Sequence, residues 1–311
     1  MKPNILIVTI VVLLSLCATA RAQDLPKSGD WIRVQSDNGE FSIEVPDDYS
    51  YFFDAEGFSV VDDRKDYVVR EMNLLNAYRD DTLISFETYR ASPDAMSPLW
   101  KATLERGVDS NKSRFHGIEV RELVRTEDKI SDRGDKFYFV SRYFKSKEFV
   151  YVLTGLSRQG ETPAMKRFFE SLKFTPGGRP LLPGVQRFGE LKVSPVEVKL
   201  VDPPPTPDKN AAAPLRPATP DPDSRPVLIA SKPRAYYVKK ARDNNTMGAV
   251  RLRLLLSDKG YIPRIDVVRT LPDGLARQSV FAALRIKFLP AVRGGKLAPI
   301  GKIVEYTFSI Y

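Results

Sequence analysis

The chain has 311 residues, of which 42% are apolar and 10% aromatic, so it is long enough for two ordinary globular domains and is not a wholly disordered chain. Its charge is divided unevenly: residues 23–175 hold 23 Lys and Arg against 28 Asp and Glu, whereas residues 226–311 hold 16 against 5. A basic C-terminal third favours anionic partners, which for an exported protein are acidic proteins, lipid head groups or cell-wall polymers rather than nucleic acid.

The first 22 residues have the features of an export signal. An almost wholly aliphatic run covers Ile5 to Leu16, and Ala20-Arg21-Ala22 fits a small-x-small cleavage site. We therefore expect cleavage after Ala22 and a periplasmic protein. The alternative is an inner-membrane anchor formed by residues 5–20, although a spanning helix needs about 20 apolar residues.

Cysteine and histidine usage limits the possible chemistry. Cleavage of the signal would remove Cys17, the only cysteine, and with it any disulfide, thiol catalyst or cysteine metal site. The only histidine, His116, lacks the partners that a metal site or a catalytic triad requires. We expect no catalytic residue, no metal and no cofactor.

Residues 29–175 predict an antiparallel sheet with helices. "FSIEVP" at Phe41 to Pro46 alternates apolar and polar residues, and five further strand-like runs follow it, the last two joined by a short polar connection. Ser97-Pro98 and Thr162-Pro163 each place a capping hydroxyl before a proline and an apolar helical stripe, which predicts two helices. The opening "FSIEVP", the long middle helix and a closing helix that runs into "FFESLKF" resemble the PsbP-like family of α+β domains.

Acidic pairs occur in this block at Asp47-Asp48, Asp62-Asp63 and Asp80-Asp81. Two carboxylates brought together can act as acid and base, which leaves an enzyme as an alternative function. Adjacent strand residues point to opposite faces, however, and Asp is common beside turns for local hydrogen-bonding reasons. We therefore interpret the pairs as turn residues.

Residues 176–226 hold 13 prolines in 51 positions, which predicts a semi-rigid spacer between two units. Only "VEVKLV" at Val196 to Val201 alternates in the manner of an added strand. We expect the spacer to hold a basic domain away from an acidic one.

Residues 227–311 predict the order strand, strand, helix, strand. "GAVRLRLLL" alternates from Gly248, "SDKG" supplies a turn, and "YIPRIDVVRT" returns as the second strand. "PDGLARQSVFAALRIKF" has apolar residues at helical spacing with Asp273 as the expected cap, and "KIVEYTFSI" closes the block.

With these residues in place, the block resembles the C-terminal domain of the TonB energy-transducer family over about 80 residues. The motifs that carry the resemblance are Gly248-Ala249-Val250, Asp258-Lys259-Gly260, Ala282-Ala283-Leu284, Phe288-Leu289-Pro290-Ala291 and Gly294-Gly295-Lys296. One departure is Tyr236-Tyr237, which stands where the family often has Tyr-Pro. We assign structural roles to Gly248, Val250, Gly260, Phe288, Pro290 and Ala291.

The resemblance implies that the last strand pairs with an extended peptide of an outer-membrane transporter or another envelope protein. Physically, three strands with one helix leave a sheet edge that can accept a partner strand. The expected contacts are main-chain groups of Ile303, Val304, Glu305, Tyr306 and Thr307, with Tyr236 nearby and the Tyr306 side chain in the core. The expected fold is therefore α+β in two domains, 29–175 and 227–311, joined by the linker 176–226. Peptidoglycan or anionic lipid is the alternative partner.

Overall fold

The computed structural model describes residues 30–310 apart from several short segments and the segment 202–222. The omitted positions inside that range are 55–57, 63–64, 93, 97–98, 101–110, 116–117, 128–135, 147–148, 176–184 and 202–222. The predicted signal, Cys17 and His116 lie outside the described residues. Within the described ranges, no helix is long and apolar enough to span a bilayer.

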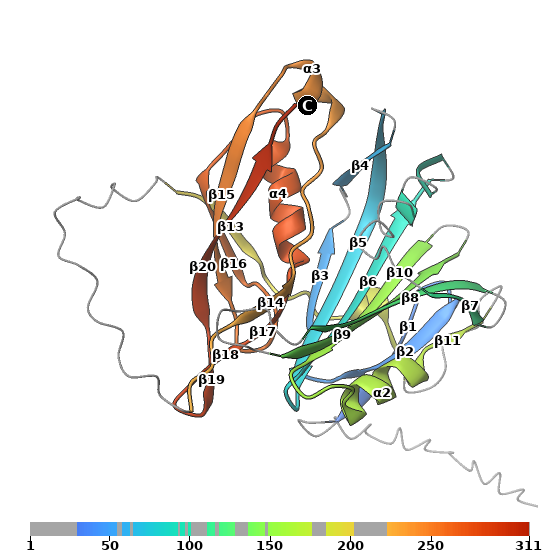
Figure 1. Cartoon of the computed structure of the whole chain (residues 1–311). Helices are drawn as coiled ribbons and strands as arrows, with labels where there is room; N and C mark the ends of the chain where they lie inside the picture. Colours follow the sequence, from blue (N-terminus) through green and yellow to red (C-terminus); the bar gives the residue numbers. More distant parts are fainter. Residues whose placement is uncertain are drawn as a thin grey trace, which may run out of the picture.

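The described chain is mainly β, so the prediction of an α+β fold is wrong. Strands supply most of the regular structure and build several sheets (Figure 1). One reason is that a second, small sheet shares with a helix the cover of one face of the large sheet. The expected middle helix is seen only as helical residues 94–96 and 99–100, and its predicted cap lies outside the described residues.

A large sheet forms the centre of the N-terminal unit, which we define as residues 31–190. Its order is β3-β5-β6-β10-β9-β8-β7, with β4 also pairing β5, and every pairing is antiparallel. The five strand runs predicted after "FSIEVP" all lie in it, and β9 and β10 form the expected hairpin. The strands are β3 (Ser50–Asp54), β4 (Phe58–Asp62), β5 (Lys65–Arg79), β6 (Thr82–Ala91), β7 (Asn111–Phe115), β8 (Ile118–Glu127), β9 (Phe137–Lys145) and β10 (Phe149–Ser157).

One face of the large sheet is covered by a small sheet and by α2 (Pro163–Ser171). The small sheet has the order β11-β2-β1-β12, and its predicted inward face, Phe41, Ile43 and Val45, is buried. The predicted cap of α2 is confirmed, because the Thr162 side chain accepts a hydrogen bond from the Met165 N–H. The small elements are β1 (Trp31–Gln35), β2 (Phe41–Pro46), β11 (Lys173–Phe174), β12 (Gln186–Arg187) and the 3-10 helix η1 (Phe188–Glu190).

The C-terminal unit, β13 to β20, contains the predicted order of strand, strand, helix and strand. These elements are β15 (Gly248–Leu256), β16 (Arg264–Arg269), α4 (Leu275–Leu284) and β20 (Ile300–Phe308). Short elements complete it: β13 (Glu197–Leu200), β14 (Leu228–Ser231), α3 (Lys239–Asp243), β17 (Lys287–Leu289), β18 (Ala291–Arg293) and β19 (Lys296–Ala298). The expected helix cap is wrong, since Gly274 occupies the N-cap position and Asp273 instead accepts hydrogen bonds from Thr246 and Asn244.

Part of the expected spacer is folded. The η1 residue Phe188 is buried in the N-terminal core, while β13 adds to β16 as a parallel strand, as the alternation from Val196 to Val201 predicts. The described chain therefore crosses from one unit to the other within residues 191–196.

The two units pack directly against each other, so the expected separation is wrong. Helix α4 lies between the C-terminal sheet and the large sheet (Figure 1), with Ala283 in the C-terminal core and Phe281 in a cluster with Val69 and Met72 of the large sheet. Residues 227–237, which we call the strap, run between the units with side chains in both cores. Its residues that pack toward the large sheet are Leu228, Ala230 and Tyr236, and those that pack toward the C-terminal sheet are Val227, Ile229, Ala235 and Tyr237.

Buried charges fasten this interface. The Lys287 Nζ lies 2.6 Å from the Glu87 Oε1 and donates to the Ser85 Oγ at 2.7 Å. The Arg285 Nε lies 3.5 Å from the Glu87 Oε2, and the Tyr89 hydroxyl donates to the same carboxylate. Glu87 and both cations have side chains at most 5% exposed, so each charge depends on the others for its stability.

Candidate functional site

Strand β20 lies at one end of the C-terminal sheet, whose order is β13-β16-β15-β20. Among the described strands, β20 pairs only with β15, and this pairing runs over nine residue pairs from Gly248↔Phe308 to Leu256↔Ile300. The opposite end is the four-residue strand β13. The longer open edge of the described sheet therefore belongs to β20.

The main-chain groups on this edge can be identified from one hydrogen bond. The Lys232 Nζ donates to the Glu305 carbonyl oxygen at 3.1 Å, so this carbonyl points away from β15. In an antiparallel strand, the N–H and C=O of alternate residues point to the same side. The outward groups are consequently those of Gly301, Ile303, Glu305 and Thr307.

The side chains on β20 alternate between core and solvent. Val304 and Tyr306 are buried, whereas Glu305 and Thr307 are exposed and Ile303 is 55% exposed. Of the five residues expected to contact a partner, only Ile303, Glu305 and Thr307 present outward main-chain groups and exposed side chains together. Val304 and Tyr306 hold the strand on the core.

Tyr306 is a core residue with a polar tip, as expected. Its hydroxyl is buried and has no hydrogen-bond partner among the described residues, and burial raises the pKa of this phenol. The Lys232 Nζ lies 5.2 Å from the centre of the Tyr306 ring, close enough for a cation–π interaction. Lys232 thus contacts both the ring of Tyr306 and the carbonyl of Glu305.

Lys232 is the edge residue that the sequence analysis missed. It lies 73 positions before Glu305 in the chain, and no local pattern connects the two. Tyr236, by contrast, was expected beside the edge but packs in the strap against the core of the large sheet. Its neighbour Tyr237 supports the C-terminal unit, with its ring 5.6 Å from that of Phe308 and its hydroxyl donating to the Thr246 carbonyl.

The motif residues occupy structural positions. Gly248 opens β15 with φ 133°, Val250 and Phe288 are fully buried, and Pro290 and Ala291 are buried where the chain leaves β17. Gly260 has φ 76°, as its turn requires. A Cβ there would also lie 2.6 Å from the Leu83 Cδ1, a contact between units that turn chemistry alone does not predict.

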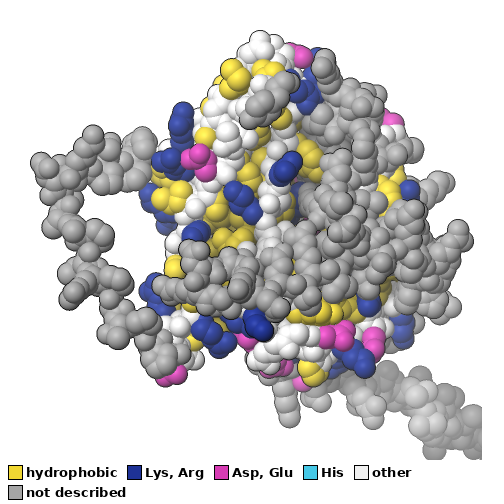
Figure 2. All heavy atoms as spheres, viewed as in Figure 1, with side chains coloured by type: hydrophobic (Ala, Val, Ile, Leu, Met, Phe, Trp, Pro, Cys, Tyr) yellow, Lys and Arg dark blue, Asp and Glu magenta, His cyan; other side chains and the backbone are white. Residues whose placement is uncertain are grey.

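The outer face of the C-terminal sheet carries an exposed ion pair and a buried carboxylate, Asp266, that is flanked by two partly exposed arginines. Arg251 lies 3.0 Å from Glu305, and Asp266 is approached by Arg264 at 2.8 Å and by Arg253 at 3.6 Å. On the side of the molecule shown in Figure 2, Lys and Arg side chains gather over this unit. An approaching chain would therefore meet a largely basic surface.

Among the described members of the acidic pairs, Asp47, Asp48 and Asp81 lie beside arginines. Asp47 and Asp48 both lie 3.0 Å from the Arg79 Nη2. Asp81 accepts from Tyr78 at 2.6 Å and lies in ion-pair contact with Arg158 and Arg225. Asp80 and Asp81 have φ 50° and 55°, as in the expected turn. Asp63 and the side chain of Asp62 lie outside the described residues.

No family model matches this chain, and no curated protein matches it. A crystal structure from Bacteroides thetaiotaomicron VPI-5482 is similar over 49% of this chain and 51% of its own, at 11% sequence identity and a TM-score of 0.31. The chain thus spans about half the length of that protein. A likeness this weak supports no inference about fold or function.

Proposed function

We propose that this protein is a non-enzymatic binding protein of the bacterial envelope that captures an extended peptide on the open edge of β20. The observation that carries the proposal is the set of outward main-chain groups on alternate β20 residues, next to the exposed Ile303. A partner strand would satisfy these groups and extend the sheet. The resemblance of the C-terminal unit to the TonB family supports the same reading and favours a segment of an outer-membrane transporter as the partner.

Charge favours an acidic peptide. Residues 226–311 carry 16 Lys and Arg against 5 Asp and Glu, and Lys232 and Lys302 lie at the β20 edge or on β20. The Lys232 ammonium already covers the Glu305 carbonyl, so an incoming strand displaces it there and can offer it a carboxylate instead. We place this binding in the periplasm, since the sequence predicts an export signal.

The test uses the full chain and synthetic peptides of about ten residues that cover the periplasm-facing segments of the host's outer-membrane transporters. Binding is measured by fluorescence anisotropy, and the amides of Ile303, Glu305 and Thr307 are followed by hydrogen exchange. We expect those three amides to become protected when the peptide binds, because their N–H groups point outward.

A substitution pair isolates the main-chain contact. Ile303→Pro removes an outward N–H without removing a bond to β15, and should weaken peptide binding about tenfold or more. Ile303→Ala keeps the N–H, so its affinity for the peptide should stay much closer to that of the unsubstituted protein than the affinity of Ile303→Pro does. Equal binding by both variants, or no amide protection in the peptide complex, would contradict the proposal. If the protein binds only peptidoglycan fragments or anionic vesicles, and this binding is lost with added salt, then the partner is peptidoglycan or anionic lipid and not a peptide.

A further inference from the structure

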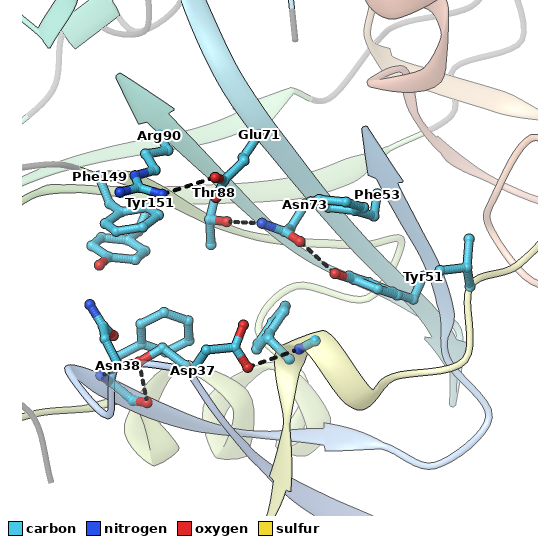
Figure 3. A pocket seen from close by; sticks show the side chains of 15 residues that line it. Asp37, Asn38, Tyr51, Phe53, Glu71, Asn73, Thr88, Arg90, Phe149 and Tyr151 are labelled. Carbon is cyan, nitrogen blue, oxygen red and sulfur yellow. Dashed lines mark hydrogen bonds and ion pairs between the residues drawn. The ribbon is translucent and has the colours of Figure 1, made fainter. Parts of the chain in front are cut away.

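The N-terminal unit contains a cavity of about 510 Å³ that the peptide-binding proposal does not use. It opens between the turn that joins β1 to β2 and the face of the large sheet, with η1 closing one side (Figure 3). A cavity of this size is typical of a site for a small organic molecule. Its lining comes from β3, β5, β6 and β10 as well as from the turn, so it exists only in the folded unit.

Aromatic side chains form much of the cavity wall. Phe41, Tyr151 and Phe188 are buried, and Phe41 lies 5.0 Å from the Tyr151 ring and 5.5 Å from the Phe188 ring. Phe149 lies 5.8 Å from Tyr151, and Phe53 at the rim is 42% exposed. The wall therefore presents preformed π faces and edges to any occupant.

Glu71 is aimed at the cavity by a β-bulge. The register between β5 and β6 shifts between Arg70 and Met72, and Glu71 has φ 55°, a left-handed conformation that glutamate rarely adopts. Bulges re-aim side chains beside functional sites, and strain of this kind persists where the surrounding structure holds it. The Glu71 Oε1 accepts from the Arg90 Nη1 at 2.9 Å, which fixes the carboxylate at the cavity wall.

A second carboxylate faces the cavity from the opposite wall. Asp37 lies in the turn between β1 and β2, where its Oδ1 accepts from the Gly189 N–H at 3.2 Å (Figure 3). With Glu71 and Arg90, the charged residues that line the cavity carry a net charge of −1. The pKa of Tyr51 is raised by burial and then by the nearby groups Asp37, Tyr49 and Glu71, so the lining is electronegative where this hydroxyl lies.

The polar groups between the two carboxylates are already organised. The Tyr51 hydroxyl donates to the Asn73 Oδ1 at 2.5 Å, and the Asn73 Nδ2 donates to the Thr88 Oγ1 at 2.9 Å (Figure 3). These two hydrogen bonds orient the Asn73 amide without involving either carboxylate. Arg90 and Gly189 each donate to one oxygen of these carboxylates, and the second oxygen of Asp37 and of Glu71 is the acceptor that we assign to a ligand.

We propose that this cavity binds a small organic cation, a primary ammonium or guanidinium group on an apolar stem. The charged group lies between Asp37 and Glu71, and the stem packs on the rings of Phe53, Phe149 and Tyr151. Carboxylates and aromatic faces both attract a cation, and their effects reinforce each other in a partly desolvated site. A neutral or anionic molecule of the same shape gains only the apolar contact.

The experiment compares three probes of one shape: phenethylammonium, 2-phenylethanol and 3-phenylpropanoate. Binding to the full chain is measured by saturation-transfer NMR and calorimetry at low and high salt. We expect the cation to bind about tenfold or more tightly than the alcohol, the anion to bind least, and the preference for the cation to shrink as salt screens the carboxylates.

Two substitutions locate the site. Glu71→Gln and Asp37→Asn should each weaken phenethylammonium binding about fivefold or more while leaving 2-phenylethanol unchanged. Glu170→Gln on the exposed face of α2 removes a carboxylate from the same unit outside the cavity and should change neither. Thermal unfolding of each variant checks that the fold is retained. Phe53→Ala at the exposed rim tests the apolar contact separately, because it should weaken the binding of both phenethylammonium and 2-phenylethanol. Equal binding of the three probes, or cation binding that survives both carboxylate substitutions, would overturn the proposal.

Discussion

The two faces of the C-terminal unit use charge in opposite ways. On the face toward the large sheet, Lys287 and Arg285 are almost fully buried and share the carboxylate of Glu87. On the outer face, Arg251 and Glu305 form a pair 3.0 Å apart with nearly half of each side chain exposed. Desolvation makes a buried charge depend on its partner, whereas water replaces a lost partner at the surface. Charged residues therefore join the two units on the inner face, whereas on the outer face an ion pair can be broken at little cost in stability, which makes that face an adaptable surface.

The large sheet and the C-terminal sheet also differ in how much of each is covered by other elements. The large sheet packs under the small sheet and α2 on one face and under the C-terminal unit on the other. The C-terminal sheet is covered by α4 on its inner face and ends at the open strand β20. We therefore expect substitutions between the units to change stability and substitutions on the outer face to change binding.

The largest expected effect comes from Glu87→Gln, which removes the carboxylate that two buried cations share. We expect a loss of about 3–5 kcal/mol in the free energy of unfolding, measured by urea denaturation. Lys287→Met is the matched control, since Glu87 then still has Arg285 3.5 Å away, and it should cost clearly less. If both variants lose the same free energy of unfolding, the two buried cations left without a carboxylate in Glu87→Gln are not the cause of its instability.

An intermediate effect is expected for Gly260→Ala. Its φ of 76° and the 2.6 Å approach of a Cβ to the Leu83 Cδ1 should together destabilise the protein by about 2 kcal/mol. Gly294→Ala offers the comparison, because φ is 55° there and nothing lies within 4 Å of the added carbon, so only about 1 kcal/mol of backbone strain is expected. Thermal unfolding should therefore show a lower midpoint for Gly260→Ala than for Gly294→Ala. The opposite order would contradict a tight contact at Gly260.

The smallest expected effect is that of Arg251→Met on the outer face. An exposed ion pair contributes about 0.2–1 kcal/mol, so the unfolding midpoint should barely move and should converge with that of the parent at high salt. A loss comparable with that of Glu87→Gln would mean that the outer face is not the adaptable surface described above.

Local patterns predicted much of the secondary structure. Thr162 caps α2 because a hydroxyl before a proline suits a helix start, and the alternation in "GAVRLRLLL" identifies β15 and its buried face. The prediction of Asp273 as a cap was wrong because its side chain found two donors, Thr246 and Asn244, from a loop nearly 30 residues earlier in the chain. Such competition between partners cannot be read from a single segment.

The sequence by itself thus determined the strand runs, the turn glycines and the separate charge of the two ends, because each depends on neighbours within a few residues. Tertiary structure alone decided that the units pack together, that Lys232 reaches Glu305, and that Asp37 faces Glu71 across an aromatic cavity. These contacts join residues far apart in the chain. They depend on which apolar faces meet and on which buried charges can be paired, and only the assembled fold decides both.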